Sequence, residues 1–248
     1  MTDQVVVRGL TKTFYDESRG AVNAVQGIDF ECHAGEILGL LGANGAGKTT
    51  TLRMLSTVLV PSAGTAVVMG HDVVKDPMSV RKNLGFYSAS TALYPRLTAR
   101  ETIEFFARIN QYPSAQVPAR VNYLIERFGI SKYAGARIEK LSSGMKQKVS
   151  IARTVAHDPP LLIFDEPTVG LDVLNALEMQ DVIKELRSQG KTILFSTHIM
   201  SEAEKLCDRI AIIHGGRILA CDTLEKLRVA TGGHYLEDIF VHYVKGQA

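Results

Sequence analysis

The sequence predicts an α/β protein with a central parallel sheet, and three short apolar runs are the main evidence for it. Residues 37–41, 161–164 and 192–195 are almost entirely apolar, and glycine or polar residues follow each run directly. Apolar runs of this length are typical of strands that a parallel sheet buries on both faces. Open α/β sheets place their ligands beyond the carboxyl ends of such strands, so we expect the functional groups there.

Length and composition fit one such domain. The chain has 248 residues, of which 46% are hydrophobic, and this suits a large buried core. We expect a single domain over residues 1–248, with a core at about 1–89 and 141–222, a helical subdomain at about 90–140 and a tail at about 223–248. No stretch approaches the roughly 18 uninterrupted apolar residues of a membrane span, and the first residues do not resemble a signal peptide. Three widely spaced cysteines fit a reducing cytosol.

The charge distribution gives no sign of a nucleic-acid-binding protein. The formal net charge is +2, with 28 Lys and Arg against 26 Asp and Glu, and no basic run reaches five residues. Nucleic-acid-binding domains usually gather their basic residues on one face. We therefore expect no nucleic-acid partner.

The N-terminal part of the chain predicts strands. Residues 5–7 and 24–30 lie in a region, about 1–35, that favours an antiparallel β structure. Residues 65–69 and 84–87 predict further strands around the core.

Residues 42–49 match the pattern of a phosphate-binding loop. They read GANGAGKT, the run 37–41 precedes them, and apolar residues at helical spacing follow from Thr49 to Leu59. Glycines let the backbone approach a phosphate without a Cβ clash, and N–H groups at a helix start attract the anion. We therefore expect nucleotide phosphates to be bound by Gly42, Asn44, Gly45, Gly47, Lys48, Thr49 and Thr50.

Three side chains of this loop have distinct expected roles. Lys48 should reach the β- and γ-phosphates, the Thr49 hydroxyl should ligate Mg²⁺, and Thr50 can donate to the α-phosphate. The structural alternative is a glycine-rich turn on a surface helix. That alternative does not explain why the strand and the helix stand on either side of the loop.

Two adjacent carboxylates, Asp165 and Glu166, end the apolar run 161–164. Carboxylates at the mouth of a buried strand are costly unless a cation or hydrogen bonds offset their desolvation. We expect Asp165 to hold Mg²⁺, through water, and Glu166 to polarise the attacking water as general base. Such a base is typically worth about 10²- to 10⁴-fold in rate. The alternative is a solvated strand end.

The remaining elements are a helical insert, a hairpin and a tail. Residues 98–140 predict helices, with Thr98 and Glu101 as a capping box and apolar residues at helical spacing at Ile103, Phe106, Ala107 and Ile109. Residues 210–219 predict a β-hairpin that turns at two glycines. The tail carries an apolar stripe, which we expect to pack on its own domain or on a second copy: Leu236, Ile239, Phe240 and Tyr243.

Residues 141–147 read LSSGMKQ and resemble the signature motif of the ABC-type ATPases, usually LSGGQ. Ser142 and Gly144 match that motif, whereas Met145 replaces its Gln, as in several exporter-type members. The resemblance covers nearly the whole chain, from about residue 5 to about residue 244.

Further segments carry the same resemblance. Residues 168–172, TVGLD, resemble the family's D-loop, and residues 196–198, STH, resemble its switch histidine. The serine-rich segment before Tyr94 resembles the sodium-efflux, NatA-like branch of the ABC exporters.

This resemblance implies ATP and Mg²⁺ as cofactors and a second ATP-binding subunit, identical in the simplest case, as partner. Ser142 and Gly144 would donate hydrogen bonds to the γ-phosphate held by the facing subunit, so that neither subunit has a complete site alone. Asp172 would cross the dimer interface. His198 would bridge the γ-phosphate and the water near Glu166, which makes Glu166, His198 and Lys48 the catalytic group.

Phe14 falls where the family stacks an aromatic ring on adenine, and the resemblance implies that role here. Each single residue also has a structural explanation. Phe14 alone would be assigned to the core, Asp172 to a helix N-cap, and a histidine after a strand to a structural role. The Ser-Thr-His context of His198 favours the catalytic role.

One departure from the family pattern lies at Ala89, where members usually carry a Gln. Alanine cannot ligate Mg²⁺ or orient a water molecule. Our hypothesis is that Ser88 or Ser90 contributes instead, through water.

Together these features predict the ATP-binding subunit of an ABC exporter. ATP-driven dimerisation and hydrolysis to ADP and phosphate would power a separately encoded transmembrane permease, from the cytoplasmic face of the cell membrane. The alternative is a soluble ABC ATPase that acts on ribosomes or DNA, and a P-loop kinase would leave the later motifs without a role. The transported substrate stays open among sodium, drugs, lipids and polysaccharides.

Overall fold

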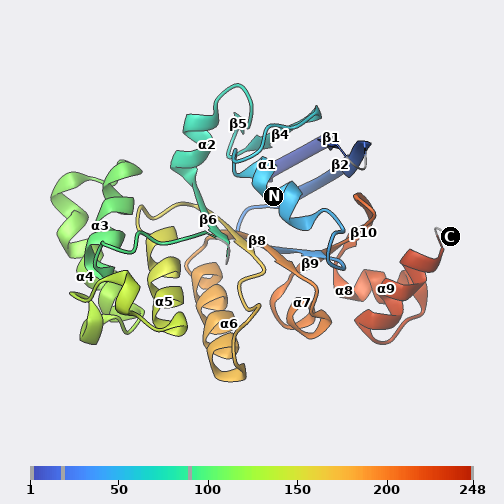
Figure 1. The fold of residues 1–248 in the computed structure, drawn as a ribbon. Helices are drawn as coiled ribbons and strands as arrows, with labels where there is room; N and C mark the ends of the chain where they lie inside the picture. Colours follow the sequence, from blue (N-terminus) through green and yellow to red (C-terminus); the bar gives the residue numbers. More distant parts are fainter. Residues whose placement is uncertain (1–2, 18–19, 89–90, 247–248) are drawn as a thin grey trace.

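A computed structural model describes residues 3–17, 20–88 and 91–246 and contains two β-sheets with helices around them (Figure 1). The first sheet is antiparallel and has the strand order β2-β1-β4-β5. Its strands are β1 (Asp3–Asp16), β2 (Gly20–His33), β4 (Ala63–Val68) and β5 (His71–Asp72). The antiparallel N-terminal region that the sequence predicts is therefore confirmed.

The second sheet is the central one, with the order β10-β9-β3-β8-β7-β6. Every neighbouring pair from β9 to β6 is parallel, and only β10 runs antiparallel. All residues of the three strands that the apolar runs predict, β3, β7 and β8, are buried. The strands are β3 (Ile37–Leu41), β6 (Leu84–Ser88), β7 (Leu161–Asp165), β8 (Thr192–Thr197), β9 (Arg209–His214) and β10 (Arg217–Asp222).

Successive residues of the central strands face opposite sides, because the side chains of a strand alternate. Leu162, Phe164 and Phe195 join one hydrophobic cluster with α5 and α6, which are drawn below the sheet, and with the helical insert, which is drawn at its left (Figure 1). Leu161 and Ile163 join a second cluster with α1 and the antiparallel sheet. These helices are α1 (Lys48–Leu55), α5 (Ser143–Thr154) and α6 (Val173–Ser188), and two shorter ones are α2 (Pro77–Asn83) and α7 (Met200–Leu206).

The helical insert forms an arm at one end of the molecule (Figure 1). It contains α3 (Ala99–Ile109) and α4 (Val117–Arg127), with three short 3₁₀ turns, and α3 packs against α4 and α5. Thr98 caps α3 through the expected box: its hydroxyl accepts from the Glu101 N–H while Glu101 accepts from the Thr98 N–H. Among the described residues, no helix is both long and apolar enough to cross a membrane.

The C-terminal tail packs on its own domain. It contains α8 (Leu224–Thr231) and α9 (Leu236–Lys245), and the stripe residues Leu236 and Ile239 are fully buried. Both lie in a cluster with residues of β9 and α7. The first of the two predicted placements of the stripe is therefore confirmed.

The strand predicted around the core at residues 65–69 exists as β4, and the structure shows that it pairs with β1 in the antiparallel sheet. Local composition favours a strand without specifying its partner, and here long-range pairing decided it. Helix α1 ends at Leu55, not Leu59, because Thr57 adopts a left-handed conformation with φ 60° that a helix cannot continue.

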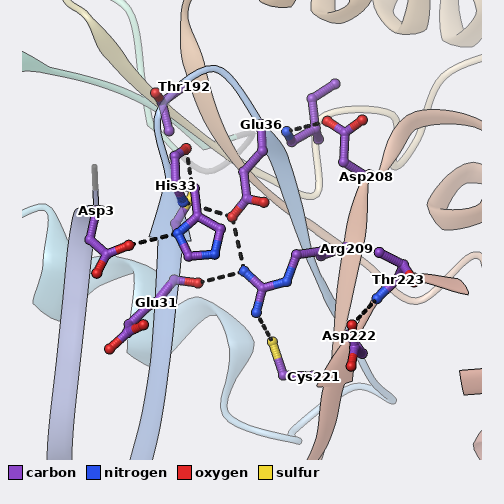
Figure 2. Close-up of polar contacts among 12 residues, drawn as sticks. Asp3, Glu31, His33, Glu36, Thr192, Asp208, Arg209, Cys221, Asp222 and Thr223 are labelled. Atoms are coloured by element: carbon purple, nitrogen blue, oxygen red, sulfur yellow. Dashed lines mark hydrogen bonds and ion pairs between the residues drawn. The ribbon is translucent and has the colours of Figure 1, made fainter. Parts of the chain in front are cut away.

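A polar network joins the two sheets at the start of the parallel strands (Figure 2). The Arg209 guanidinium donates to the Glu31 carbonyl at 3.1 Å, to the Glu36 carboxylate at 3.1 Å and to the Cys221 sulfur at 3.5 Å. Glu36 also accepts from the His33 N–H at 2.7 Å. Strand β2 is thus held to β9 and β10, which fixes the antiparallel sheet beside the core.

His157, between α5 and β7, makes stability depend on pH. Burial lowers the pKa of His157 from 6.5 to about 4, although its Nε2 donates to the Leu84 carbonyl at 3.2 Å. Between these pH values the unfolded chain binds a proton that the folded chain does not, so the free energy of unfolding falls as the pH is lowered. From pH 7 to pH 5 we expect a loss of about 2 kcal/mol from this group.

Urea unfolding of the wild type and of His157→Gln at pH 7 and pH 5 measures this loss. The glutamine variant should lose about 2 kcal/mol less over that interval. An equal loss in both proteins would contradict the assignment to His157.

Candidate functional site

The loop between β3 and α1 adopts the strand–loop–helix arrangement that the sequence predicts. Gly47, at φ 106°, precedes the first residue of α1, and a Cβ atom there would lie 2.6 Å from the Ala24 carbonyl oxygen. A Cβ atom on Gly42 would lie 2.3 Å from the Ile213 carbonyl oxygen. Only glycine fits at these two positions, so the loop can lie close against its neighbours and present its N–H groups outward.

A cavity of about 290 Å³ opens over this loop. Most of the predicted phosphate-binding residues line it, together with Glu166 from the end of β7. Its lining comprises Ala24, Asn44, Gly45, Gly47, Lys48, Thr49, Thr50 and Glu166. Backbone N–H groups at a helix N-terminus and a buried ammonium group make this a site for an anion such as a phosphate.

Lys48 is the cation of the cavity. It is only 4% exposed, and its Nζ donates to the Gly42 carbonyl at 2.8 Å and to the Ala43 carbonyl at 3.1 Å. Its third contact is the Glu166 carboxylate at 3.1 Å. The ammonium is therefore fixed beside the loop rather than free to point into solvent.

Asp165 lies at the centre of a hydroxyl cluster. One carboxylate oxygen accepts from the Thr49 hydroxyl at 3.0 Å and from the Ser196 hydroxyl at 2.9 Å. The Ser88 hydroxyl approaches its other oxygen at 3.4 Å, which is long for such a bond. These hydrogen bonds offset the desolvation of the buried carboxylate and orient it toward Thr49.

Glu166 has an unusual backbone. Its φ is 47°, in the left-handed region that is uncommon for residues other than glycine. Its N–H is held by the Ser196 carbonyl at 3.2 Å and by the Ser196 hydroxyl at 3.0 Å, while its carboxylate lies 3.3 Å from the His198 Nδ1. Burial alone would raise the pKa of Glu166, but the hydrogen bond and charge of Lys48, with His198, bring that pKa below its ordinary value. The carboxylate is therefore ionised at neutral pH.

The residues present fit a nucleotide phosphate and a Mg²⁺ ion. Among the described residues no three histidine, cysteine or acidic side chains gather into a metal cage. Mg²⁺ is typically held by one or two carboxylates together with the phosphates of its substrate, and Thr49 and Asp165 offer one hydroxyl and one carboxylate at 3.0 Å from each other. A Mg²⁺ ion here would polarise a phosphate oxygen, and Glu166 is placed to accept a proton from a water molecule.

Other predicted site residues lie elsewhere. Ser142 and Asp172 are the N-caps of α5 and α6, accepting from the N–H groups of Met145 and Asn175 respectively, so the helix-capping role of Asp172 is confirmed. Gly144 lines a different cavity, of about 390 Å³, between α5 and α6. Within the described part of the chain, these residues are not brought to the cavity over the phosphate loop.

Phe14 lies on β1 and is 39% exposed, with the Lys12 ammonium 5.2 Å from its ring centroid. It is therefore not a core residue. It does not line the cavity over the phosphate loop, where Ala24 on the neighbouring strand β2 does.

The sequence argument missed the role of Ser196. Its hydroxyl contacts both Asp165 and the N–H of Glu166, so one side chain positions both acids. The available signal was its position: Ser196 directly follows the apolar run 192–195, as Asp165 follows the run 161–164, and the carboxyl ends of parallel strands meet at the same edge of a sheet.

Our hypothesis is that Ser88 or Ser90 takes over the role of the Gln that the family usually carries at position 89. Ala89 and Ser90 lie outside the described residues, so the structure bears only on Ser88. We expect Ser88→Ala to raise the Mg²⁺ concentration needed for half-maximal hydrolysis about 2- to 10-fold, because in this hypothesis the Ser88 hydroxyl holds a water ligand of the ion through a hydrogen bond worth about 0.5–1.5 kcal/mol. A Mg²⁺ titration of the hydrolysis rate measures this shift, with Ser56→Ala as control. An unchanged titration midpoint would remove Ser88 from the site.

Comparison with known proteins agrees with this site. Residues 25–169 match the family model for "ABC transporter". The chain is 39% identical to the ABC transporter ATP-binding protein NatA of Bacillus subtilis, covering 96% of both chains, and 36% identical to the daunorubicin/doxorubicin resistance ATP-binding protein DrrA of Streptomyces peucetius, covering 95% of this chain and 70% of that one.

The fold agrees as well. A solved structure of the ATP-binding subunit of an ABC transporter superposes with a TM-score of 0.87 at 30% identity, covering 97% of this chain and 99% of that one. The family match spans more than half of the chain and includes the phosphate loop and both carboxylates. The chain therefore belongs to the ABC transporter family, in which it is an ATP-binding subunit that hydrolyses ATP.

Proposed function

We propose that two copies of this chain bind ATP between them and drive export through a separately encoded transmembrane permease. One observation carries the proposal. Ser142, Gly144 and Asp172, the residues of the signature and D-loop segments, stand apart from the cavity that Lys48 and Glu166 line. A second copy facing the phosphate loop would bring its own signature segment to the γ-phosphate and complete the site.

Each residue of the site then has a role. Lys48 and the loop N–H groups bind the phosphates, and Thr49 and Asp165 hold Mg²⁺. Glu166 accepts the proton of the attacking water, and His198, 3.3 Å from the Glu166 carboxylate, bridges that water and the γ-phosphate. Phe14, which is half-exposed on β1, offers its ring to the adenine base.

The permease would dock on the helical arm. Tyr94, Phe105 and Ile109 are exposed there, and the rings of Tyr94 and Phe105 meet edge to face at 5.8 Å. Exposed apolar groups that adjoin one another are typical of protein–protein contacts. A cavity of about 200 Å³ beside them, lined by Phe86 and Arg153 among others, would receive a segment of the permease.

The transported substrate is bound by the permease, so the site described above does not select it. We propose sodium as the first substrate to test, because of the similarity to NatA over nearly the whole chain. Other relatives are named for daunorubicin resistance and for Nod factor export. Export of a larger molecule is therefore the competing outcome.

Affinity capture with Glu166→Gln tests the proposal. This variant should bind ATP without hydrolysing it and so trap the two-copy state. Tagged protein is expressed in its native cell, solubilised in mild detergent and captured with ATP and Mg²⁺, and capture without ATP is the control. A stoichiometric membrane protein with several spans would support the proposal, whereas ribosomes or nucleic acid without such a protein would favour a soluble ABC ATPase.

A further inference from the structure

The left-handed backbone at Glu166 has to be held from both sides. Such a conformation in a residue other than glycine persists only where the surrounding structure determines it. On its N-terminal side the Glu166 N–H is bound by Ser196. On its C-terminal side the following residue is Pro167, and the Pro167 carbonyl accepts a hydrogen bond from the Gln147 Nε2 at 3.1 Å.

Gln147 comes from a distant part of the fold. It lies in the second turn of α5, the helix that Ser142 caps. Its side chain also lines a cavity of about 590 Å³ together with Tyr87, a buried residue near the end of β6. The ring centroid of Tyr87 lies 5.9 Å from that of Phe164 on β7. Gln147 thus connects the signature helix to the turn after Glu166 and lies beside the end of β6.

We propose that Gln147 is a positioning residue for ATP hydrolysis: its amide fixes the turn after Glu166, so that the Glu166 carboxylate stays beside Lys48 and His198. A shift of that turn would move the base with respect to its water. Misplacement of about 1 Å can cost about 10²-fold in rate.

A second consequence rests on the two-copy arrangement proposed above. In that arrangement Glu166 acts on the ATP bound by its own chain. Ser142, which caps the helix α5 that carries Gln147, contacts the ATP bound by the facing chain. Because Gln147 joins this helix to the turn after Glu166, it also couples the two ATP sites.

Three substitutions separate the contacts of Gln147. Gln147→Glu keeps the shape of the side chain but replaces its donor by an acceptor, which then faces the Pro167 carbonyl. Gln147→Met keeps the length and removes the donor without adding charge. Tyr87→Phe removes only the hydroxyl and leaves the bond to Pro167 in place. The matched control is Lys148→Gln, because the Lys148 ammonium pairs with Glu178 on α6 at 2.8 Å.

The measurement is basal ATP hydrolysis by the isolated full chain, with ATP affinity and the thermal unfolding midpoint taken on the same samples. We expect kcat to fall about 10-fold or more in both Gln147 variants, with ATP affinity within about 2-fold of wild type. Tyr87→Phe and Lys148→Gln should keep kcat within about 2-fold of wild type. A purely structural role of Gln147 would lower the unfolding midpoint and the affinity together with kcat.

Three results would overturn the positioning role. These are a wild-type kcat in both Gln147 variants, an equal loss of kcat in Lys148→Gln, or a loss of ATP affinity without a loss of kcat.

The coupling is read from the Hill coefficient for ATP, which should exceed 1 in the wild type and approach 1 in the Gln147 variants. A wild-type coefficient of 1 would contradict the two-copy arrangement, whereas unchanged cooperativity in the variants would contradict coupling through Gln147 alone.

Discussion

Glu166→Gln is expected to lower kcat for ATP hydrolysis by about 10²- to 10⁴-fold, the usual contribution of a general base. The amide has nearly the same shape as the carboxylate but cannot accept a proton from water. ATP binding should persist or strengthen, since the variant removes the negative charge that lies 3.1 Å from the Lys48 ammonium. The contacts of the phosphates with the loop are left in place.

Phosphate release at saturating ATP and Mg²⁺ measures this effect, together with the affinity for a fluorescent ATP analogue. Glu178→Gln is the matched control, because it makes the same chemical change on the surface of α6, where Glu178 pairs with Lys148. If Glu166→Gln turned over ATP at the wild-type rate, Glu166 would not be the base.

The second large effect concerns ATP binding by Lys48→Ala. The Lys48 ammonium has three contacts in the structure, to the carbonyls of Gly42 and Ala43 and to Glu166. A charge-assisted hydrogen bond to a phosphate is worth about 1.5–3 kcal/mol. Loss of one such bond should weaken ATP binding about 10- to 150-fold, and hydrolysis should fall with it.

Calorimetric titration with ATP and Mg²⁺ measures the affinity, and the thermal unfolding midpoint shows whether the loop still folds. Lys226→Ala on α8 is the control, since its exposed ammonium pairs only with nearby Asp222 among the contacts described and lies outside the cavity. Unchanged affinity in a folded Lys48→Ala protein would contradict the assigned role.

Features that depend on neighbouring residues were predictable from the sequence. The phosphate loop is one of them, because its glycines, Lys48 and Thr49 follow one strand and begin one helix. The capping box of Thr98 and Glu101 is another, since both partners lie within one turn. The burial of β7 and β8 was also readable, because a continuous apolar run leaves no polar face for solvent.

The tertiary structure alone decided which distant residues meet. Nothing local to β4 distinguishes pairing with β1 from pairing within the core, so its place in the antiparallel sheet came from long-range register. The contacts of Ser196 with Asp165 and of Gln147 with Pro167 join segments that are 31 and 20 residues apart.

The sequence by itself thus determined the class of fold, the phosphate loop and the two acids, because each is encoded in a short contiguous stretch. The tertiary structure decided how those acids are held. Packing of β8 and α5 against the end of β7 brings Ser196 and Gln147 to either side of Glu166 and holds it in a left-handed conformation that its own sequence does not favour.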